Sequence, residues 1–308
     1  MSEIDQLIEC MRAWAPAPMA LATVTETWGS APRPRGSHML VCADGRFEGS
    51  VSGGCVEGDV LAAAAATIAD GQPRRLRYGV TDAAAWEVGL PCGGEIALIV
   101  QPLTGRGFPP ALLDRIAEAR ATGHSFAVTT DLESGSSREG IAEGADIVVN
   151  RYHPPRRLFV IGAVQIAQPL IRIAREMDVA PAVIDPRARF LTPERFPDTL
   201  LDDRWPDEAI AAFAPDAASA VVTLSHDPKI DDPALIAALR SPAAYVAALG
   251  SRRSHAARLD RLRAAGLSEE QLARINAPAG IYIGALGPAE IALSIAAGMV
   301  RAFRGVNA

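Results

Sequence analysis

The chain has 308 residues, a length typical of two domains, and 49% of them are apolar, which excludes a disordered chain. Its formal net charge is −6, which excludes a general attraction to nucleic acid or to an anionic membrane, so any anion-binding site must be local. The four cysteines lack a CxxC pair and the N-terminus lacks the features of a secretory signal, so we expect reduced thiols and a cytoplasmic protein.

The first half of the sequence mixes predicted helices and strands in no regular order. Helices are expected at residues 2–13, 60–69 and 110–122, with a further helical turn at 81–89, and strands at 19–28, 38–42, 46–51, 73–79, 95–101, 124–131 and 146–150. The turn at 43–45 makes two of these strands a hairpin, and the Ser-, Gly- and Glu-rich segment 132–144 is expected to be a surface loop. Residues 1–150 are therefore predicted to form a mixed α+β domain.

The second half, residues 151–308, alternates predicted strands with helices. A proline-stiffened linker at 152–157 opens it, and strands are expected at 158–161, 180–184, 199–202, 220–224 and 243–249. Helices are expected to end near Glu176 and to cover 207–213, 232–239 and 254–265, followed by a capping box at Ser268 and a last helix at 288–304. The alternation predicts a parallel, doubly wound, Rossmann-like sheet, so the fold class is α/β.

The apolar segment 281–300 near the C-terminus is long enough to raise the question of a membrane span. Pro288 and Glu290 interrupt it. We therefore expect a buried loop followed by a helix rather than a membrane crossing.

A loop rich in glycine and cysteine at residues 49–59 is the most distinctive stretch of the first domain. Cys55 follows two adjacent glycines and precedes an alanine-rich helix, whose N-terminus favours a thiolate and can also bind a phosphate. Cys92 also adjoins two glycines, so the pair suggests soft sulfur ligands for a metal. Alternatively, both cysteines are small buried residues at crowded turns. The candidate residues of this site are Ser52, Gly53, Gly54, Cys55, Cys92, Gly93 and Gly94.

Two arginines precede this loop in a turn that is rich in proline and glycine. Arg33 and Arg35 alternate with prolines, which pre-order the backbone near polyproline II and leave the guanidinium groups little entropy to lose on binding. Such a pair can form a fork for a phosphate or a carboxylate. The alternative is a solvated loop.

The start of the second domain resembles a dinucleotide-binding unit with a broken fingerprint. Gly162 follows a predicted strand, and Asp185 ends the next strand 23 positions later, where an acidic residue would bind a ribose hydroxyl. Val164, however, stands where a glycine would let the pyrophosphate approach the backbone. The pattern therefore favours the Rossmann-like architecture and argues against tight NAD(P) binding. Asp185 can equally cap the turn that follows it.

Two more clusters follow predicted strands, at the edge where open α/β sheets bind ligands. His226 and Asp227 suit a general base or a metal pair, with a purely structural role as the alternative. The segment 250–255 places hydroxyls, among them that of Ser251, and the two arginines Arg252 and Arg253 at a predicted helix start, which suits a phosphate, with a purely structural role as the alternative.

Taken together, these motifs and their order resemble the XdhC/CoxI family of molybdenum-cofactor maturation factors. The resemblance covers nearly the whole chain and is specific because several separate motifs occur in the same order. In the first domain it rests on Gly29-Ser30-Ala31-Pro32-Arg33 with Gly36, on Gly49-Ser50-Val51-Ser52-Gly53-Gly54-Cys55-Val56-Glu57 and on Leu90-Pro91-Cys92-Gly93-Gly94. In the second it rests on Asp185-Pro186-Arg187, Arg195-Phe196-Pro197, His226-Asp227-Pro228, Ala248-Leu249-Gly250-Ser251-Arg252-Arg253 and Pro288-Ala289-Glu290-Ile291-Ala292.

The resemblance implies a chaperone rather than an enzyme with turnover of its own. Such a protein binds and protects molybdenum cofactor, presents it to a cysteine desulfurase for sulfuration and helps to insert it into the apo-enzyme of a molybdenum hydroxylase of the xanthine dehydrogenase or CO dehydrogenase type. Cys55 or Cys92 would contact molybdenum or relay sulfur, and the loops with arginine and glycine would hold the phosphate. The alternatives are an NAD(P)-dependent oxidoreductase and a client-docking protein without cofactor binding. We expect a homodimer only because two-fold dimers are the commonest assembly.

Overall fold

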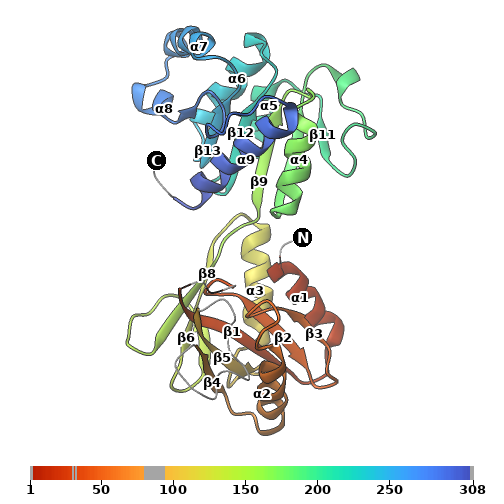
Figure 1. Ribbon diagram of the computed structural model, residues 1–308, viewed down its shortest axis with the longest axis vertical. Coiled ribbons are helices and arrows are strands. Elements are labelled where there is room, and N and C mark those ends of the chain that lie inside the picture. The colour runs from red at the N-terminus through yellow and green to blue at the C-terminus, as the bar shows by residue number, and fades with distance from the viewer. Residues whose placement is uncertain (1–2, 30, 32, 80–93, 306–308) are drawn as a thin grey trace. The chain divides into compact units, whose positions relative to one another are not determined.

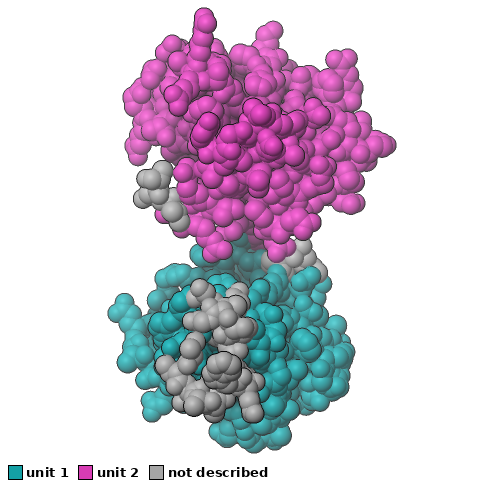
Figure 2. All heavy atoms as spheres, viewed as in Figure 1, with its two compact units in different colours: residues 1–154 teal, residues 155–308 magenta. Residues whose placement is uncertain are grey.

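The computed structural model describes residues 3–29, 31, 33–79 and 94–305, and the predicted helical turn at 81–89 lies outside these residues (Figure 1). The chain divides into two compact units, unit 1 at Met1–Pro154 and unit 2 at Pro155–Ala308 (Figure 2). No helix among the described residues combines the length and the apolar character that a membrane crossing requires.

A five-stranded antiparallel sheet forms the centre of unit 1, in the order β3-β2-β1-β5-β4. The strands are β1 (Met19–Trp28), β2 (His38–Cys42), β3 (Phe47–Gly49), β4 (Arg74–Tyr78) and β5 (Glu95–Pro102). Because side chains alternate across a strand, β1 serves two cores. Ala20, Ala22 and Val24 pack under α2 (Glu57–Asp70), whereas Met19 and Leu21 pack with apolar residues of α1 (Glu3–Trp14) and α3 (Pro110–Ala121).

A smaller antiparallel sheet in unit 1 has the order β7-β6-β8 and corrects one prediction. Its strands are β6 (Phe126–Asp131), β7 (Ser136–Glu139) and β8 (Ile147–Tyr152). The prediction of a surface loop over 132–144 was wrong, because β7 lies within it and pairs Ser137 with Thr130 of β6. All four β7 residues are polar, so no apolar alternation marked the strand, and the pairing partner decided its conformation.

Unit 2 contains a six-stranded parallel sheet in the order β11-β10-β9-β12-β13-β14, the Rossmann-like arrangement that the sequence predicted. Its strands are β9 (Arg156–Ile161), β10 (Val179–Ile184), β11 (Leu200–Asp202), β12 (Ser219–Thr223), β13 (Tyr245–Ala248) and β14 (Ile275–Asn276). Helices cover both faces: α4 (Ala167–Glu176), α5 (Pro206–Phe213), α6 (Pro228–Leu239), α7 (Arg252–Ala264), α8 (Glu269–Ala273) and α9 (Pro288–Phe303). Leu158 and Val160 of β9 pack under α4 and α9, whereas Phe159 and Ile161 pack on the opposite face.

Three details at element boundaries complete the comparison with the sequence. The predicted linker at 152–157 is shorter than expected, because β8 continues to Tyr152 and β9 already starts at Arg156. The capping box at Ser268 is confirmed, with Gln271 as its second member. The two-residue strand β14 was missed, because it is too short to carry a pattern.

The segment before α9 differs from the expectation of a buried loop. The helix itself starts at Pro288 as predicted, but Tyr282 is 100% exposed and Leu286 is 91% exposed. Apolar composition indicates that a side chain gains from burial, and it does not say whether the chain supplies a surface to cover it.

Candidate functional site

The loop before α2 presents Cys55 at a helix start, as the sequence predicted. Helix α2 begins at Glu57 with Val56 as its N-cap, so the thiol lies two residues before the first helical position. Val56 is buried in the apolar core under α2, and Cys55 is half-buried against the same core. Gly53 and Gly54, with φ angles of 77° and 115°, form the exposed crest of the loop and leave its backbone open to an approaching molecule.

The carboxylate of Glu57 folds back into this loop and accepts its donors. Its Oε1 accepts hydrogen bonds from the Ser50 hydroxyl at 2.6 Å and from the Ser52 N–H at 2.9 Å. Its Oε2 accepts from the Gly54 N–H at 2.8 Å, from the Val56 N–H at 3.2 Å and from the Ser52 hydroxyl. Partial burial alone would raise the pKa of Glu57, but these hydrogen bonds outweigh it and lower the pKa to about 2.

The remaining N–H groups of the loop are also paired. The Ser52 hydroxyl oxygen accepts from the N–H groups of Cys55 and Val56, each at 3.0 Å, and the Ser50 hydroxyl accepts from Gly53 at 2.9 Å. Five successive N–H groups, from residue 52 to residue 56, therefore have acceptors within the loop. The predicted phosphate would have to displace Glu57. Sequence reasoning did not assign Glu57 a role, although an acidic first helical residue after two glycines was the available signal.

The two arginines of the preceding turn point to different partners. Arg33 donates through Nε to the Ser50 carbonyl at 3.2 Å and forms an ion pair with Glu3, so it connects the turn to the loop and to α1. Arg35 donates to the Val149 carbonyl at 3.3 Å. The structure thus brings Arg33, but not Arg35, to the loop that contains Cys55.

The second predicted thiol site adjoins β5. Gly94 is buried just before that strand, whereas Cys92 and Gly93 lie outside the described residues. Within the described part of the chain, no group of three or more His, Cys, Asp or Glu side chains is arranged to hold a metal ion. Metal binding by Cys55 and Cys92 stays a prediction.

In unit 2, Asp185 lies at the end of β10 with both carboxylate oxygens engaged. Oδ2 accepts from the Ala163 N–H at 2.8 Å, and Oδ1 accepts from the N–H and Nε of Arg187 at 3.0 and 2.8 Å. Burial alone would raise the pKa of Asp185, but these hydrogen bonds and the Arg187 charge have the larger effect. The pKa of Asp185 is therefore below its ordinary value. These contacts match the alternative in which Asp185 caps the turn that follows it.

Gly162 lies beside Asp185, in the turn after β9. It has a φ of +102°, and a Cβ there would lie 2.9 Å from the Ser225 backbone nitrogen. The glycine is therefore required by close packing against Ser225, two residues after the end of β12, irrespective of any ligand. Arg195 adds a hydrogen bond to the Ala163 carbonyl at 2.7 Å, so the turn is held from several sides.

The segment after β12 separates the two residues that were predicted as a pair. Asp227 is the N-cap of α6, where its side chain accepts from the Lys229 N–H at 3.0 Å. His226 is exposed and lines a hollow of about 140 Å³ together with Asp231 and Arg258. Asp231 is buried and accepts from the Ser225 hydroxyl at 2.7 Å, and burial raises its pKa.

Arg258 in α7 was not singled out by the sequence. It is 5% exposed, donates to the Leu249 carbonyl at 2.9 Å and lies 4.0 Å from Asp231. Its Nε and Nη1 have no hydrogen-bond partner among the described residues, and burial lowers its pKa. No sequence signal could have identified it, because nearly all basic residues of this chain are arginine.

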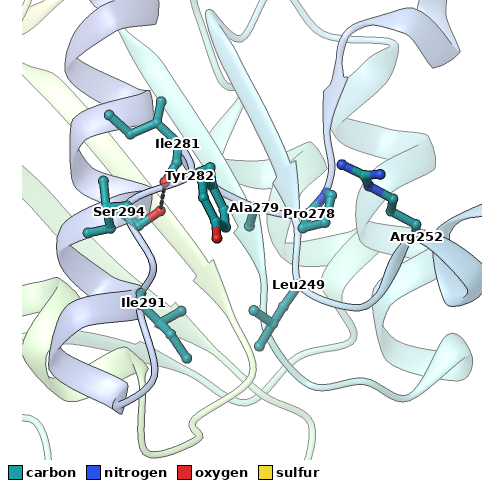
Figure 3. Close-up of a pocket in the computed structure, with 11 residues that line it drawn as sticks. Leu249, Arg252, Pro278, Ala279, Ile281, Tyr282, Ile291 and Ser294 are labelled. Carbon is teal, nitrogen blue, oxygen red and sulfur yellow. Dashed lines mark hydrogen bonds between the residues drawn. The ribbon is translucent and has the colours of Figure 1, made fainter.

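Ser251 and Arg252 have different surroundings although they are adjacent. The Ser251 side chain accepts from the Ser254 N–H at 3.1 Å and caps α7. Arg252 instead lines a pocket of about 420 Å³ beyond the end of β13, shown in Figure 3. The predicted phosphate ligands of this turn therefore divide into a cap and a pocket side chain.

Comparison with known proteins connects both units to one family. A family model described as "XdhC and CoxI family" matches residues 14–79, and one described as "XdhC Rossmann domain" matches residues 158–299. The chain is 31% identical over 286 residues to the Escherichia coli protein named molybdenum cofactor insertion chaperone PaoD. The matched region covers 90% of this chain and 81% of that protein.

Two further relatives and one solved structure agree with this result. The chain is 28% identical to the uncharacterised Escherichia coli protein YqeB, covering 91% of this chain and 42% of that protein. It is 25% identical to a Bacillus subtilis protein named as a probable xanthine dehydrogenase component, covering 91% of this chain and 92% of that protein. A crystal structure described as a xanthine dehydrogenase from Bacillus halodurans matches this chain with a TM-score of 0.79 at 24% sequence identity. The match covers 100% of this chain and 97% of the chain in that structure, and it supports the fold alone.

Proposed function

Because the chain belongs to the XdhC and CoxI family, we propose that it is a chaperone that carries molybdenum cofactor and inserts it into a client enzyme. The observation that carries this proposal is the 31% identity to PaoD, a protein named for that task, over 90% of the chain. The client is the apo-enzyme of a molybdenum hydroxylase, and sulfuration by a cysteine desulfurase precedes insertion. Both steps take place in the cytoplasm.

The loop around Cys55 supports a role as the contact to the molybdenum end of the cargo. Sulfur is a soft metal ligand, and the Cys55 thiol is half-buried at the base of the loop, just before α2. The exposed crest of Gly53 and Gly54 leaves room for a bulky cargo next to the sulfur. Glu57 holds the loop through its hydrogen bonds, so the thiol is held in place before the cargo arrives.

The same loop is a poor site for the phosphate end of the cargo. The N–H groups that would bind a phosphate already donate to Glu57 and to Ser52, and the Glu57 carboxylate would repel a second anion. We therefore place the phosphate elsewhere.

The test is anaerobic binding of purified molybdenum cofactor to the wild type and to Cys55→Ala and Cys92→Ala. Cys10→Ala is the matched control, since Cys10 is also half-buried in unit 1 but lies in α1. We expect weaker retention of the cofactor, and slower activation of an apo-hydroxylase, in at least one of the first two variants. Equal retention in all four proteins would refute the thiol contact, and absence of retention by the wild type would refute the chaperone function.

Excess NAD in the same assay tests the dinucleotide alternative. Asp185, the residue that would bind a ribose, is engaged by Ala163 and Arg187, so we expect NAD to leave cofactor retention unchanged. Displacement of the cofactor by NAD would contradict this expectation.

A further inference from the structure

The pocket in unit 2 lies at the carboxyl end of β13, between the start of α7 and the segment that leads into α9. Its volume of about 420 Å³ lies within the range of small-molecule sites in proteins. Figure 3 shows Leu249 and Ile291 on opposite sides of it, with Tyr282 above them and Arg252 beside Pro278. The carboxyl edge of a parallel sheet is where open α/β folds bind their ligands.

One wall of the pocket is fixed before any ligand binds. The Asn276 side chain accepts from the Gly280 N–H at 2.7 Å and from the Tyr245 hydroxyl at 2.6 Å. The Ser294 hydroxyl of α9 donates to the Ile281 carbonyl at 2.5 Å. Gly280 has a φ of +96°, and a Cβ there would lie 2.3 Å from Ser294 Oγ, so its backbone packs directly on the helix. A wall that is already ordered reduces the entropy that binding must overcome.

The charge in this pocket is unbalanced. Arg252 is the one charged side chain among the described lining residues, and the others are apolar, glycine, Tyr282 or Ser294. Arg252 has no hydrogen-bond or ion-pair partner among the described residues, in contrast to Arg33 with Glu3 and Arg187 with Asp185. In a chain with a net charge of −6, a cation left free at the rim of an apolar pocket suits an anionic ligand group.

The rest of the lining suits a flat ring. Tyr282 presents its whole ring to solvent at the pocket, and Leu249 and Ile291 supply apolar contact area. Aromatic rings stack on such a side chain in an offset geometry. We infer that the pocket binds a flat heteroaromatic ring that carries a phosphate, with the ring against Tyr282 and the phosphate on Arg252.

Two kinds of molecule share this chemistry: the pterin and phosphate of the proposed cargo, and a free nucleotide. Assignment to the cargo rests on the proposed function, whereas the ring-and-phosphate chemistry rests on the pocket alone. The site is separate from the Gly162 turn, where Asp185 closes the position in which a dinucleotide would place its ribose.

The first experiment is calorimetric binding of guanosine monophosphate to the full chain, with guanosine and inorganic phosphate as the separate halves of that probe. Arg252→Gln should weaken binding of guanosine monophosphate by about tenfold or more, because it removes a charge-assisted contact. Arg253→Gln is the matched control, since Arg253 is the next residue in α7, is also exposed and does not line the pocket. Each half of the probe should bind more weakly than the whole.

The inference would be overturned by no binding of guanosine monophosphate to the wild type, by equal binding to the wild type and R252Q, or by an equal loss in R253Q. Binding of phosphate as tightly as of the nucleotide would do so as well, because the ring would then contribute nothing.

Anaerobic cofactor retention then separates the two sources of the ligand. A loss of retention in R252Q, with competition by guanosine monophosphate, assigns the pocket to the cargo. Unchanged retention in R252Q, with nucleotide binding still lost, assigns it to a free nucleotide. If the wild type retains no cofactor, the chaperone function fails while the nucleotide result stands on its own.

Discussion

The loop around Cys55 in unit 1 and the pocket at Arg252 in unit 2 differ in how far the chain satisfies its own polar groups. In the loop, five successive N–H groups have acceptors from Glu57, Ser52 or Ser50. At the pocket, the Arg252 guanidinium has no partner among the described residues, and the Tyr282 ring is fully exposed. The sequence of the glycine-rich loop predicted an anion site, but the cation that the structure leaves without a partner among the described residues is Arg252 at the pocket.

The difference indicates a division of tasks. A loop whose donors are all used can hold one reactive group, the Cys55 thiol, in a fixed position, but it has nothing left to bind an anion with. A pocket with an ordered wall and an unpaired cation can take up a ligand without first breaking contacts of its own. The predictions below test the two halves of this contrast.

The largest effect is expected where the pocket wall meets α9. In Gly280→Ala the new Cβ would lie 2.3 Å from Ser294 Oγ and 2.6 Å from the Ser294 carbonyl carbon, at a φ of +96°. Backbone strain and overpacking together should lower the free energy of unfolding of unit 2 by about 3 kcal/mol or more and abolish binding in the pocket. Urea unfolding followed by hydrogen exchange in each unit measures this. Gly284→Ala is the control, with a φ of +74° but nothing within 4 Å of its Cβ, and an equal loss there would remove the packing argument.

His38 in unit 1 is a titratable side chain that is buried and therefore closed to solvent. His38 forms hydrogen bonds with Thr23 at 2.9 Å and with Tyr152 at 2.9 Å. Burial lowers the pKa of His38 from 6.5 to about 4, against a smaller opposing effect of a hydrogen bond with Ala22. The folded state therefore resists protonation, and the stability that this provides is present above pH 6.5 and is lost as the pH falls towards 4.

The expected loss is about 3 kcal/mol over the whole range and about 2 kcal/mol by pH 5, before most carboxylates titrate. Tryptophan fluorescence during urea unfolding reports mainly on unit 1, which contains Trp14, Trp28 and Trp86, whereas unit 2 contains Trp205. His38→Gln should flatten the pH dependence between pH 7 and pH 5, and exposed His124→Gln should leave it unchanged. The same slope in H38Q and in the wild type would contradict the assignment.

Glu57→Ala should convert the closed loop into an open one. The variant leaves the N–H groups of Ser52 and Gly54 without their acceptor, which should lower the stability of unit 1 by about 2 kcal/mol. Added phosphate should then raise the melting temperature of the variant but not that of the wild type. Asp59→Asn is the control, because Asp59 is exposed in the same helical turn and tests the helix dipole alone. If phosphate acts equally on both proteins, Glu57 is not what closes the loop.

The fold was largely predictable from the sequence, because its signals are local. The Ala, Leu, Val and Thr composition of residues 19–28 identified β1, and short apolar strands between helices identified the parallel sheet around β9. Strand β7 was not predicted, because its four residues are polar and its conformation depends on pairing with β6.

The site was predictable only in part, because side-chain direction is a tertiary property. The position of Cys55 before a helix follows from local propensity, and the structure confirms it. That Arg252 faces a pocket while Arg258 is buried beside Asp231 follows from how α7 packs, and both residues look alike in the sequence. The pocket depends on the contact between Gly280 and Ser294 of α9, and no sequence pattern predicts that contact.

The smallest stability change, and the sharpest test of the contrast, is expected from Arg252→Gln. An exposed side chain without a partner should change the free energy of unfolding by less than about 0.5 kcal/mol when it is replaced, in contrast to the loss in Glu57→Ala. Urea unfolding of R252Q and R253Q beside the wild type provides the measurement. A loss in R252Q as large as that in Glu57→Ala would mean that Arg252 already has a structural partner. The pocket would then be as closed as the loop around Cys55, and its cation would not be available to a ligand.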